Sequence, residues 1–263
     1  MTDIRMADVS EWQGNVDAPT YMNAGYKCII ARTYSGYRPD KMMPGRRDYL
    51  RGYKFTGLGW YAYLAKDVDA KQQANAFIQT IGTLKANEWP ILDVEEGSGS
   101  QTSRAQAWFD VVDKWAGFPA MLYASQYFFK DQLSGVGHWG NRPLWMAAYS
   151  SKEPTEKHDL WQFTDSYNFP GIGTKIDGNL AHMSADEFIK RMRAGKAPAP
   201  SPEPAPTPKP GKAAQTLVSV VKADGCLEVF VETASGEVKH RWQPKPNAGT
   251  WSDWASMGTP GGK

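Results

Sequence analysis

The feature that most constrains the fold of this 263-residue chain is a run of alternating prolines from Ala197 to Pro210. Proline fixes φ and has no amide hydrogen to donate, so a proline at every second position excludes both helix and sheet. In an extended polyproline conformation such a run spans roughly 40 Å. The sequence therefore predicts two domains, residues 1–195 and 213–263, joined by a Pro-rich linker over residues 196–212.

The first domain alternates strand-like and helical patterns. Apolar residues recur at helical spacing over Val68–Leu84 and Ser103–Ala116, and Ser184–Glu187 reads as a capping box that opens a helix ending at Gly195. The strand-like apolar runs are Tyr26–Arg32, Gly57–Leu64, Trp89–Glu95, Ala120–Tyr123 and Leu144–Tyr149. This alternation predicts an α/β fold, either a parallel barrel or a doubly wound sheet.

Beyond the linker the apolar period changes to two. Leu217–Val221, Leu227–Val231 and Val238–Trp242 alternate in this way and are separated by Asp-Gly and Ser-Gly turns, and Trp251–Trp254 would supply a last strand. This pattern predicts an antiparallel meander of three or four strands. A module of about 50 residues buries little core and is marginally stable alone.

Charge, hydropathy and cysteine content narrow the classes of partner and compartment. A formal net charge of +2 is too small to attract nucleic acid. No stretch approaches transmembrane length and Met1–Met6 has no apolar signal core, so we expect no membrane partner, no signal peptide and synthesis in the cytoplasm. Cys28 and Cys226 fall in different predicted domains, and two unpaired thiols are typical of a reducing compartment.

No cofactor and no metal ion are expected. The chain has four histidines, none of them at ligand spacing: His138, His158, His182 and His240. There is no Gly-rich phosphate loop and no nucleophilic serine in an elbow context.

Two carboxylates stand at the end of one apolar run, in Asp93-Val-Glu95. Side chains two apart on a strand point the same way, and the carboxyl ends of strands carry the sites of α/β folds, so both would enter one space and Glu96 would point away. Burial and mutual repulsion raise one pKa, which supplies a protonated acid beside an ionised partner, as acetal cleavage requires. The alternative is that these residues cap the next helix.

Asp8 and Asp177 are further candidates. Asp8 ends the apolar stretch Ile4–Val9, and Asp177 lies near the last strand of the first domain. In a closed barrel the first and last strands are neighbours, so the two would meet at one rim; the alternative is that they are turn residues. The 11 Trp and 12 Tyr suit a sugar-binding groove, although such rings also fill cores.

Segments of the first domain resemble, in order, those of the glycoside hydrolase family 25 muramidases, the Chalaropsis-type lysozymes. The resemblance runs from Asp8 to about Asn179. The segments that carry it are Asp8–Gly14, Ile29–Arg32, Tyr61–Tyr63, Pro90–Glu95, Leu144–Tyr149, Trp161–Phe163 and Ile176–Asn179.

The resemblance implies a flattened TIM-like β/α barrel with fewer than eight helices. It also implies hydrolysis of the β-1,4 bond between N-acetylmuramic acid and N-acetylglucosamine in peptidoglycan, with Glu95 as general acid/base, Asp93 assisting and Asp8 shaping the field. The remaining residues are expected to bind the sugar: Asp177, Tyr61, Tyr63, Arg32, Trp145, Tyr149 and Trp161.

The second domain resembles one blade of a tachylectin-like or fucose-lectin-like β-propeller, which implies binding of wall carbohydrate. Its matching segments are Asp224–Val231, Gly236–Gln243 and Trp251–Trp254. Propellers need several blades and this chain has one. Several chains could pool blades in a homo-oligomer, the blade could dock on the catalytic domain, or it could be a remnant.

The function expected from these features is that of a phage-type endolysin, made in the host cytoplasm and reaching the wall once the membrane is permeabilised. One alternative is a catalytically inactive wall adhesin, which the intact Asp8, Asp93 and Glu95 argue against. The other is a host autolysin, which the missing signal peptide and the short second domain argue against.

Overall fold

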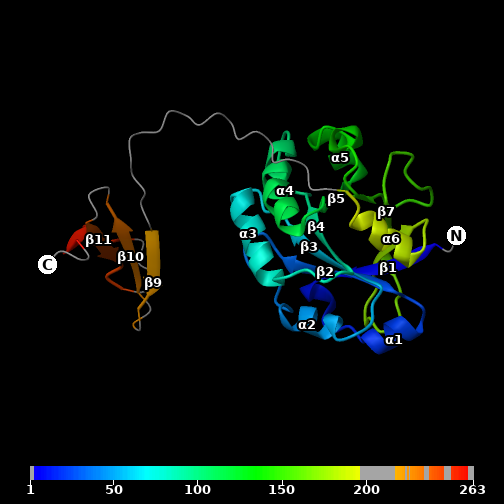
Figure 1. Cartoon of the computed structure of the whole chain (residues 1–263), viewed down its shortest axis with the longest axis horizontal. Helices are drawn as coiled ribbons and strands as arrows, with labels where there is room; N and C mark the ends of the chain where they lie inside the picture. The colour runs from blue at the N-terminus through cyan, green and yellow to red at the C-terminus, as the bar shows by residue number, and fades with distance from the viewer. Residues whose placement is uncertain are drawn as a thin grey trace. The chain divides into compact units, whose positions relative to one another are not determined.

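The computed structural model describes residues 3–195 and, farther along the chain, residues 217–222, 224, 226–233, 237–245 and 250–259. It comprises two compact units, Met1–Ser201 and Pro202–Lys263, which Figure 1 shows. The predicted linker over residues 196–212 lies outside the described residues.

The first unit is a closed barrel whose strands follow chain order from β1 to β8. The strands are β1 Ile4–Val9, β2 Cys28–Tyr34, β3 Gly57–Tyr63, β4 Glu88–Asp93, β5 Met121–Ser125, β6 Leu144–Ala147, β7 Leu160–Tyr167 and β8 Ile176–Ala181. Neighbours from β1 to β7 pair in parallel, and β8 pairs antiparallel with both β7 and β1. The barrel prediction is confirmed, and the doubly wound alternative is wrong.

Six α-helices accompany these eight strands within residues 3–195, which confirms the expectation of fewer than eight. They are α1 Ala18–Asn23, α2 Gly45–Arg51, α3 Ala70–Ile81, α4 Thr102–Ala116, α5 Gln126–Gln132 and α6 Ala185–Met192. The predicted capping box is present at the start of α6, where Ser184 and Glu187 bond each other's backbone amides. No helix in the described parts of the chain has the length and apolar character needed to cross a membrane.

Two apolar layers hold the barrel, as the alternation of side chains along each strand requires. The outer layer lies between strands and helices, where Phe77 of α3 packs on Trp108 of α4 with ring centroids 5.3 Å apart. In Figure 1 these two helices lie side by side against the strands. The inner layer includes Trp89, whose ring meets Phe188 of α6 at 5.5 Å. The apolar interior leaves the carboxyl ends of the strands as the place where polar side chains gather.

The second unit is an antiparallel sheet in the order β12-β11-β10-β9. Its strands are β9 Leu217–Val221, β10 Leu227–Glu232, β11 Val238–Trp242 and β12 Ala255–Gly258. The meander prediction is confirmed, but a strand at Trp251–Trp254 is wrong, because the last strand begins after these residues. Trp251 and Trp254 instead place their rings 5.0 and 4.8 Å from the guanidinium carbon of Arg241.

Candidate active site

Four carboxylates meet at one mouth of the barrel. Asp8 lies near the end of β1, Asp93 is the last residue of β4, and Glu95 follows two residues later. Asp177 lies near the start of β8, which begins at this mouth because β8 runs antiparallel to its neighbours. The charge of Asp177 raises the pKa of Asp8 and that of Glu95, and the charges of Glu95 and Asp8 raise the pKa of Asp93. The four carboxyl groups therefore lie within electrostatic reach of one another.

Asp8 is buried and held by two amide side chains. Its Oδ2 accepts hydrogen bonds from Asn179 Nδ2 at 2.8 Å and from Gln162 Nε2 at 3.1 Å. Burial, followed by the charge of Asp177, raises the pKa of Asp8 from 3.8 to about 8, although the two amides oppose the shift. At neutral pH this carboxyl group therefore retains a proton for much of the time.

Asp93 is also buried, with 6% of its surface exposed. Its Oδ1 has no hydrogen-bond partner among the described residues. Burial, then the charges of Glu95 and Asp8, raise the pKa of Asp93 well above its usual value, and the nearby Arg32 only partly offsets this. A buried acceptor without a donor is costly, so a hydrogen-bond donor brought by a ligand would stabilise this oxygen.

Glu95 is the member of the group that solvent reaches most freely. Its carboxyl group is nevertheless surrounded by enough protein that loss of hydration raises its pKa, and the charge of Asp177 adds to this while the Tyr123 hydroxyl opposes it. An accessible carboxyl group with a raised pKa can deliver a proton to a bound substrate.

Glu96, next in the chain, has a different environment. Its Oε2 accepts a hydrogen bond from the Tyr63 hydroxyl at 3.2 Å, and its Oε1 lies 3.7 Å from Lys66 Nζ. The next helix, α4, begins at Thr102 with Gln101 at its N-cap. The alternative that Asp93 and Glu95 cap this helix is therefore wrong.

Uncharged side chains that the sequence analysis did not single out connect the site. Gln162 of β7 accepts hydrogen bonds through Oε1 from the hydroxyls of Tyr123 at 2.8 Å and Tyr149 at 3.0 Å, while its Nε2 reaches Asp8. Asn179 and Gln162 both stand inside segments that resemble the family, and this was the available signal for them. Tyr123 is the register partner of Asp93 on the next strand.

The three tyrosines expected to bind sugar lie around the carboxylates. Tyr149 is 58% exposed, and Tyr61 and Tyr63 are half-buried. Burial raises the pKa of Tyr61, and the charges of Asp8 and Asp93 add to the effect.

The two tryptophans expected to bind sugar are buried. Trp145 is 2% exposed, and its Nε1 donates to Asn179 Oδ1 at 2.7 Å. Trp161 is 8% exposed, and its Nε1 donates to the carbonyl of Ala148 at 2.8 Å. In this structure both therefore support the site from beneath and present little surface to a ligand.

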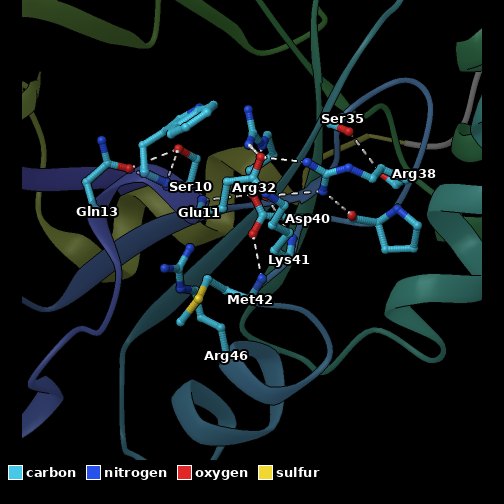
Figure 2. Close-up of polar contacts among 12 residues, drawn as sticks. Ser10, Glu11, Gln13, Arg32, Ser35, Arg38, Asp40, Lys41, Met42 and Arg46 are labelled. Atoms are coloured by element: carbon cyan, nitrogen blue, oxygen red, sulfur yellow. Dashed lines mark hydrogen bonds and ion pairs between the residues drawn. The ribbon is translucent and has the colours of Figure 1, made fainter.

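Arg32 joins the mouth to a network of ion pairs shown in Figure 2. Its Nε lies 2.8 Å from Asp40 Oδ2 and its Nη2 lies 3.1 Å from Glu11 Oε1. Glu11 also receives two hydrogen bonds from Arg38, at 2.8 and 3.1 Å. These contacts fix the loop after β1, which contains the short 3-10 helix η1 Glu11–Gln13, against the loop after β2.

Comparison with known proteins agrees with the barrel fold. The model of the family Glycosyl hydrolases family 25 matches residues 7–172. The bacterial lysozyme of Streptomyces coelicolor superimposes with a TM-score of 0.65 at 17% identity, over 73% of this chain and 98% of that one. The CTP1L endolysin superimposes with a TM-score of 0.59 at 28% identity, over 72% of this chain and 69% of its own.

A curated relative is the uncharacterized protein YegX of Escherichia coli strain K12, which is 27% identical over 136 residues. The match covers 49% of each protein, so the chain spans about half the length of the curated relatives that it matches.

Proposed function

We propose that this chain, which belongs to glycosyl hydrolases family 25, is a muramidase. It hydrolyses the β-1,4 bond between N-acetylmuramic acid and N-acetylglucosamine in bacterial peptidoglycan. The observation that carries the proposal is the grouping of one accessible carboxyl group, Glu95, with three partly or fully buried ones at one barrel mouth. Such a set supports acid/base cleavage of an acetal.

Glu95 acts as the general acid/base. Its raised pKa keeps a proton available for the leaving-group oxygen, and its exposure lets the substrate reach it. After the sugar bond breaks, the same carboxylate accepts the proton of the incoming water.

Asp93 assists at the sugar ring. Its unpartnered Oδ1 accepts a hydrogen bond from the acetamido N–H of the substrate, which orients that group toward the reacting carbon. Asp8, held by Asn179 and Gln162, and Asp177 set the local field that keeps the cluster from ionising completely. Tyr149, with its exposed ring, supplies a face on which a pyranose packs.

The biological role that we propose is that of a phage-type endolysin, and the CTP1L relative is an endolysin by name. The protein would be made in the host cytoplasm and would reach the wall after the membrane is permeabilised. The second unit would then bind wall carbohydrate in the manner of a single lectin-like propeller blade, with blades of several chains pooled in an oligomer.

The reaction is tested by digesting purified peptidoglycan, reducing the new sugar ends with borohydride and identifying them by mass spectrometry. The proposal expects muramitol at every new end. Glucosaminitol would show cleavage of the other glycosidic bond. Intact walls that nevertheless retain the protein would show an adhesin, and either result would overturn the proposal.

A further inference from the structure

A pocket lies at the same end of the barrel as the carboxylates. Its volume is about 630 Å³. It is lined by Asn15, Val16, Asp17, Met42, Gly45, Arg46, Tyr49 and Gly171. The segments that form it follow β1, follow β2 and precede β8, so all of them belong to the mouth. The amide of Asp17 donates to the carbonyl of Gly171 at 2.8 Å, which closes one side.

The wall of this pocket contains a buried cation with an unused donor. Arg46 is 5% exposed, and its Nη2 donates to the carbonyl of Gly14. Its Nη1 is buried and has no hydrogen-bond partner among the described residues. A buried guanidinium that lacks a partner is destabilising, and an anion that reaches it would relieve the cost.

The neighbouring carboxylates do not supply that anion. Asp40 and Glu11 are occupied by Arg32 and Arg38, and the remaining Asp40 oxygen accepts from the backbone amide of Met42 at 2.9 Å. Figure 2 shows the Arg46 guanidinium beside the Met42 side chain, outside the dashed contacts of this network.

Three carboxylates and three guanidinium groups balance in formal charge here, but no ion pair joins Arg46 to a carboxylate among the described residues. The carboxylates of Glu11 and Asp40 face three guanidinium groups, those of Arg32, Arg38 and Arg46. The carboxylate of Asp17, at the rim of the pocket, caps α1 by accepting from the amide and the hydroxyl of Thr20. All three carboxylates are thus held by partners other than Arg46, whose Nη1 is left without a hydrogen-bond acceptor.

The pocket adjoins the catalytic group electrostatically. The charge of Tyr61 raises the pKa of Arg46, and the charges of Asp8 and Asp93 raise the pKa of Tyr61. Because the pocket segments and the carboxylates lie at the same end of the barrel, a ligand that spans the mouth can place its reacting bond at the carboxylates and an acidic side branch beside Arg46. The apolar neighbours of Arg46, which include Val16 and Met42, suit the small aliphatic groups that flank such an acid.

We propose that this pocket binds a carboxylate of the peptide stem of peptidoglycan, with Arg46 as its counter-ion. The inference rests on the proposed function, since the glycan at the mouth is what brings the stem to the pocket. The structure thus assigns to this chain a preference for glycan strands that still carry acidic peptide stems.

Binding is measured by calorimetry in the full chain carrying Glu95→Gln, so that no ligand is consumed. The ligands are a soluble N-acetylglucosaminyl-N-acetylmuramyl peptide with free carboxylates and the same compound with its carboxylates amidated. We expect Arg46→Met to raise Kd for the free acid roughly 10- to 100-fold, the usual worth of a hydrogen bond to a charged group, and to leave Kd for the amide unchanged.

Arg47→Met is the matched control, because Arg47 loses the same charge on the same helix but bonds Asp48 and the carbonyl of Thr80 outside the pocket. It should change neither Kd. Asn15→Trp provides a second variant that keeps the contact between Arg46 and Gly14, because Asn15 is an exposed pocket residue. This variant should raise Kd for the free acid, because the Trp side chain would block the pocket.

Equal effects of Arg46→Met on both ligands, or no effect on either, would overturn the inference. If Arg46→Met fails to fold, Asn15→Trp decides alone, and an unchanged Kd for the free acid would then overturn it. Failure of the wild type to release muramitol ends would refute the proposed function instead, and the two failures are therefore distinguishable.

Discussion

At the scale of single residues, the site is a group of carboxyl groups that cannot all ionise together. Asp8 and Asp93 are buried, and each lies within the field of Glu95. Like charges in a poorly hydrated space hold protons that isolated carboxylates would release. The arrangement costs folding stability, and it is also what makes proton transfer available near neutral pH.

This cost predicts a pH-dependent stability. The folded chain holds a proton on Asp8 that the unfolded chain releases between pH 3.8 and about 8, so this residue lowers stability progressively as the pH rises through that window. Asp8→Asn removes the titration. We expect the fall in Tm of the wild type between pH 5 and pH 8 to be smaller in the variant, while its activity is lost. Thermal unfolding at both pH values checks this, and an identical fall in both proteins would refute it.

The sequence could locate the charged part of the site but not its supports. Asp93 and Glu95 follow an apolar run at a spacing of two, and this alone places them on one side of a strand end. Trp145 is different, because the same ring suits a sugar platform and a core, and only the folded chain shows that it is buried. Gln162 and Asn179 are uncharged amides, and no composition or spacing signal distinguishes them.

At the scale of elements, strand β3 contains two glycines, Gly57 and Gly59, at positions where neighbouring side chains pack closely against the backbone. A Cβ on Gly59 would lie 2.8 Å from both Ile30 and the Trp89 ring, and one on Gly57 would lie 2.3 Å from Ile189 of α6. Gly59 is therefore required by close packing, since Ile30 and Trp89 are themselves fully buried, whereas the Ile189 side chain that Gly57 would meet is only partly buried.

Gly59→Ala is accordingly expected to lower the free energy of unfolding by about 1–3 kcal/mol, the usual cost of overpacking. Gly137→Ala is the control, because a Cβ there meets nothing within 4 Å, and its effect should stay within about 0.5 kcal/mol. Denaturant unfolding of both variants measures this. Equal free energies of unfolding for the two variants would show that the residues around Gly59 can shift to accommodate a methyl group.

The loop between β6 and β7 is held in place by contacts of Glu153 with two histidines, His158 and His182. Glu153 in this loop lies 2.8 Å from both His158 Nε2 and His182 Nε2, and Asp3 lies 3.1 Å from His182 Nδ1. The hydrogen bond to Glu153, followed by that to Asp3, raises the pKa of His182 above 6.5. The stabilisation is complete below pH 6.5 and is lost as the pH rises through the raised pKa.

We expect Glu153→Gln to return the pKa of His182 toward 6.5, as measured by NMR titration of its imidazole. Glu156→Gln serves as control, since Glu156 lies in the same loop but bonds Gln126. A pKa of His182 that is the same in the wild type and in Glu153→Gln would contradict the ion-pair assignment.

Element order followed from sequence patterns, but two details did not. Helical spacing over Val68–Leu84 and Ser103–Ala116 corresponds to α3 and α4. The antiparallel direction of β8 escaped prediction, although the stretch from β7 to β8 is too short for a crossover helix. The last strand of the second unit was placed too early because Trp251 and Trp254 resemble strand residues while they pack on Arg241.

At the scale of the whole molecule, the chain consists of two compact units. The first unit contains every residue that we place in catalysis, and its barrel closes without the second. The second unit has a sheet of only four strands, so its stability is expected to be the lower of the two.

A chain ending at Gly195 should therefore unfold at the Tm of the barrel in the full protein and should hydrolyse short soluble glycans at an unchanged rate. Its rate on intact walls should fall, because we propose that the second unit supplies wall binding. Calorimetry and parallel assays on the two substrates check this. An unchanged rate on intact walls would remove the reason for assigning wall binding to the second unit.

The central claim, that Glu95 is the acid/base of a muramidase, is tested most directly by comparing Glu95→Gln with Glu96→Gln on purified peptidoglycan. The two substitutions are isosteric, affect adjacent residues and remove the same charge, but Glu96 is bonded to Tyr63 and lies apart from the cluster. We predict that release of reducing ends falls by at least about 100-fold in Glu95→Gln and stays within a few-fold of wild type in Glu96→Gln. Comparable activity in the two variants, or the larger loss in Glu96→Gln, would contradict the account.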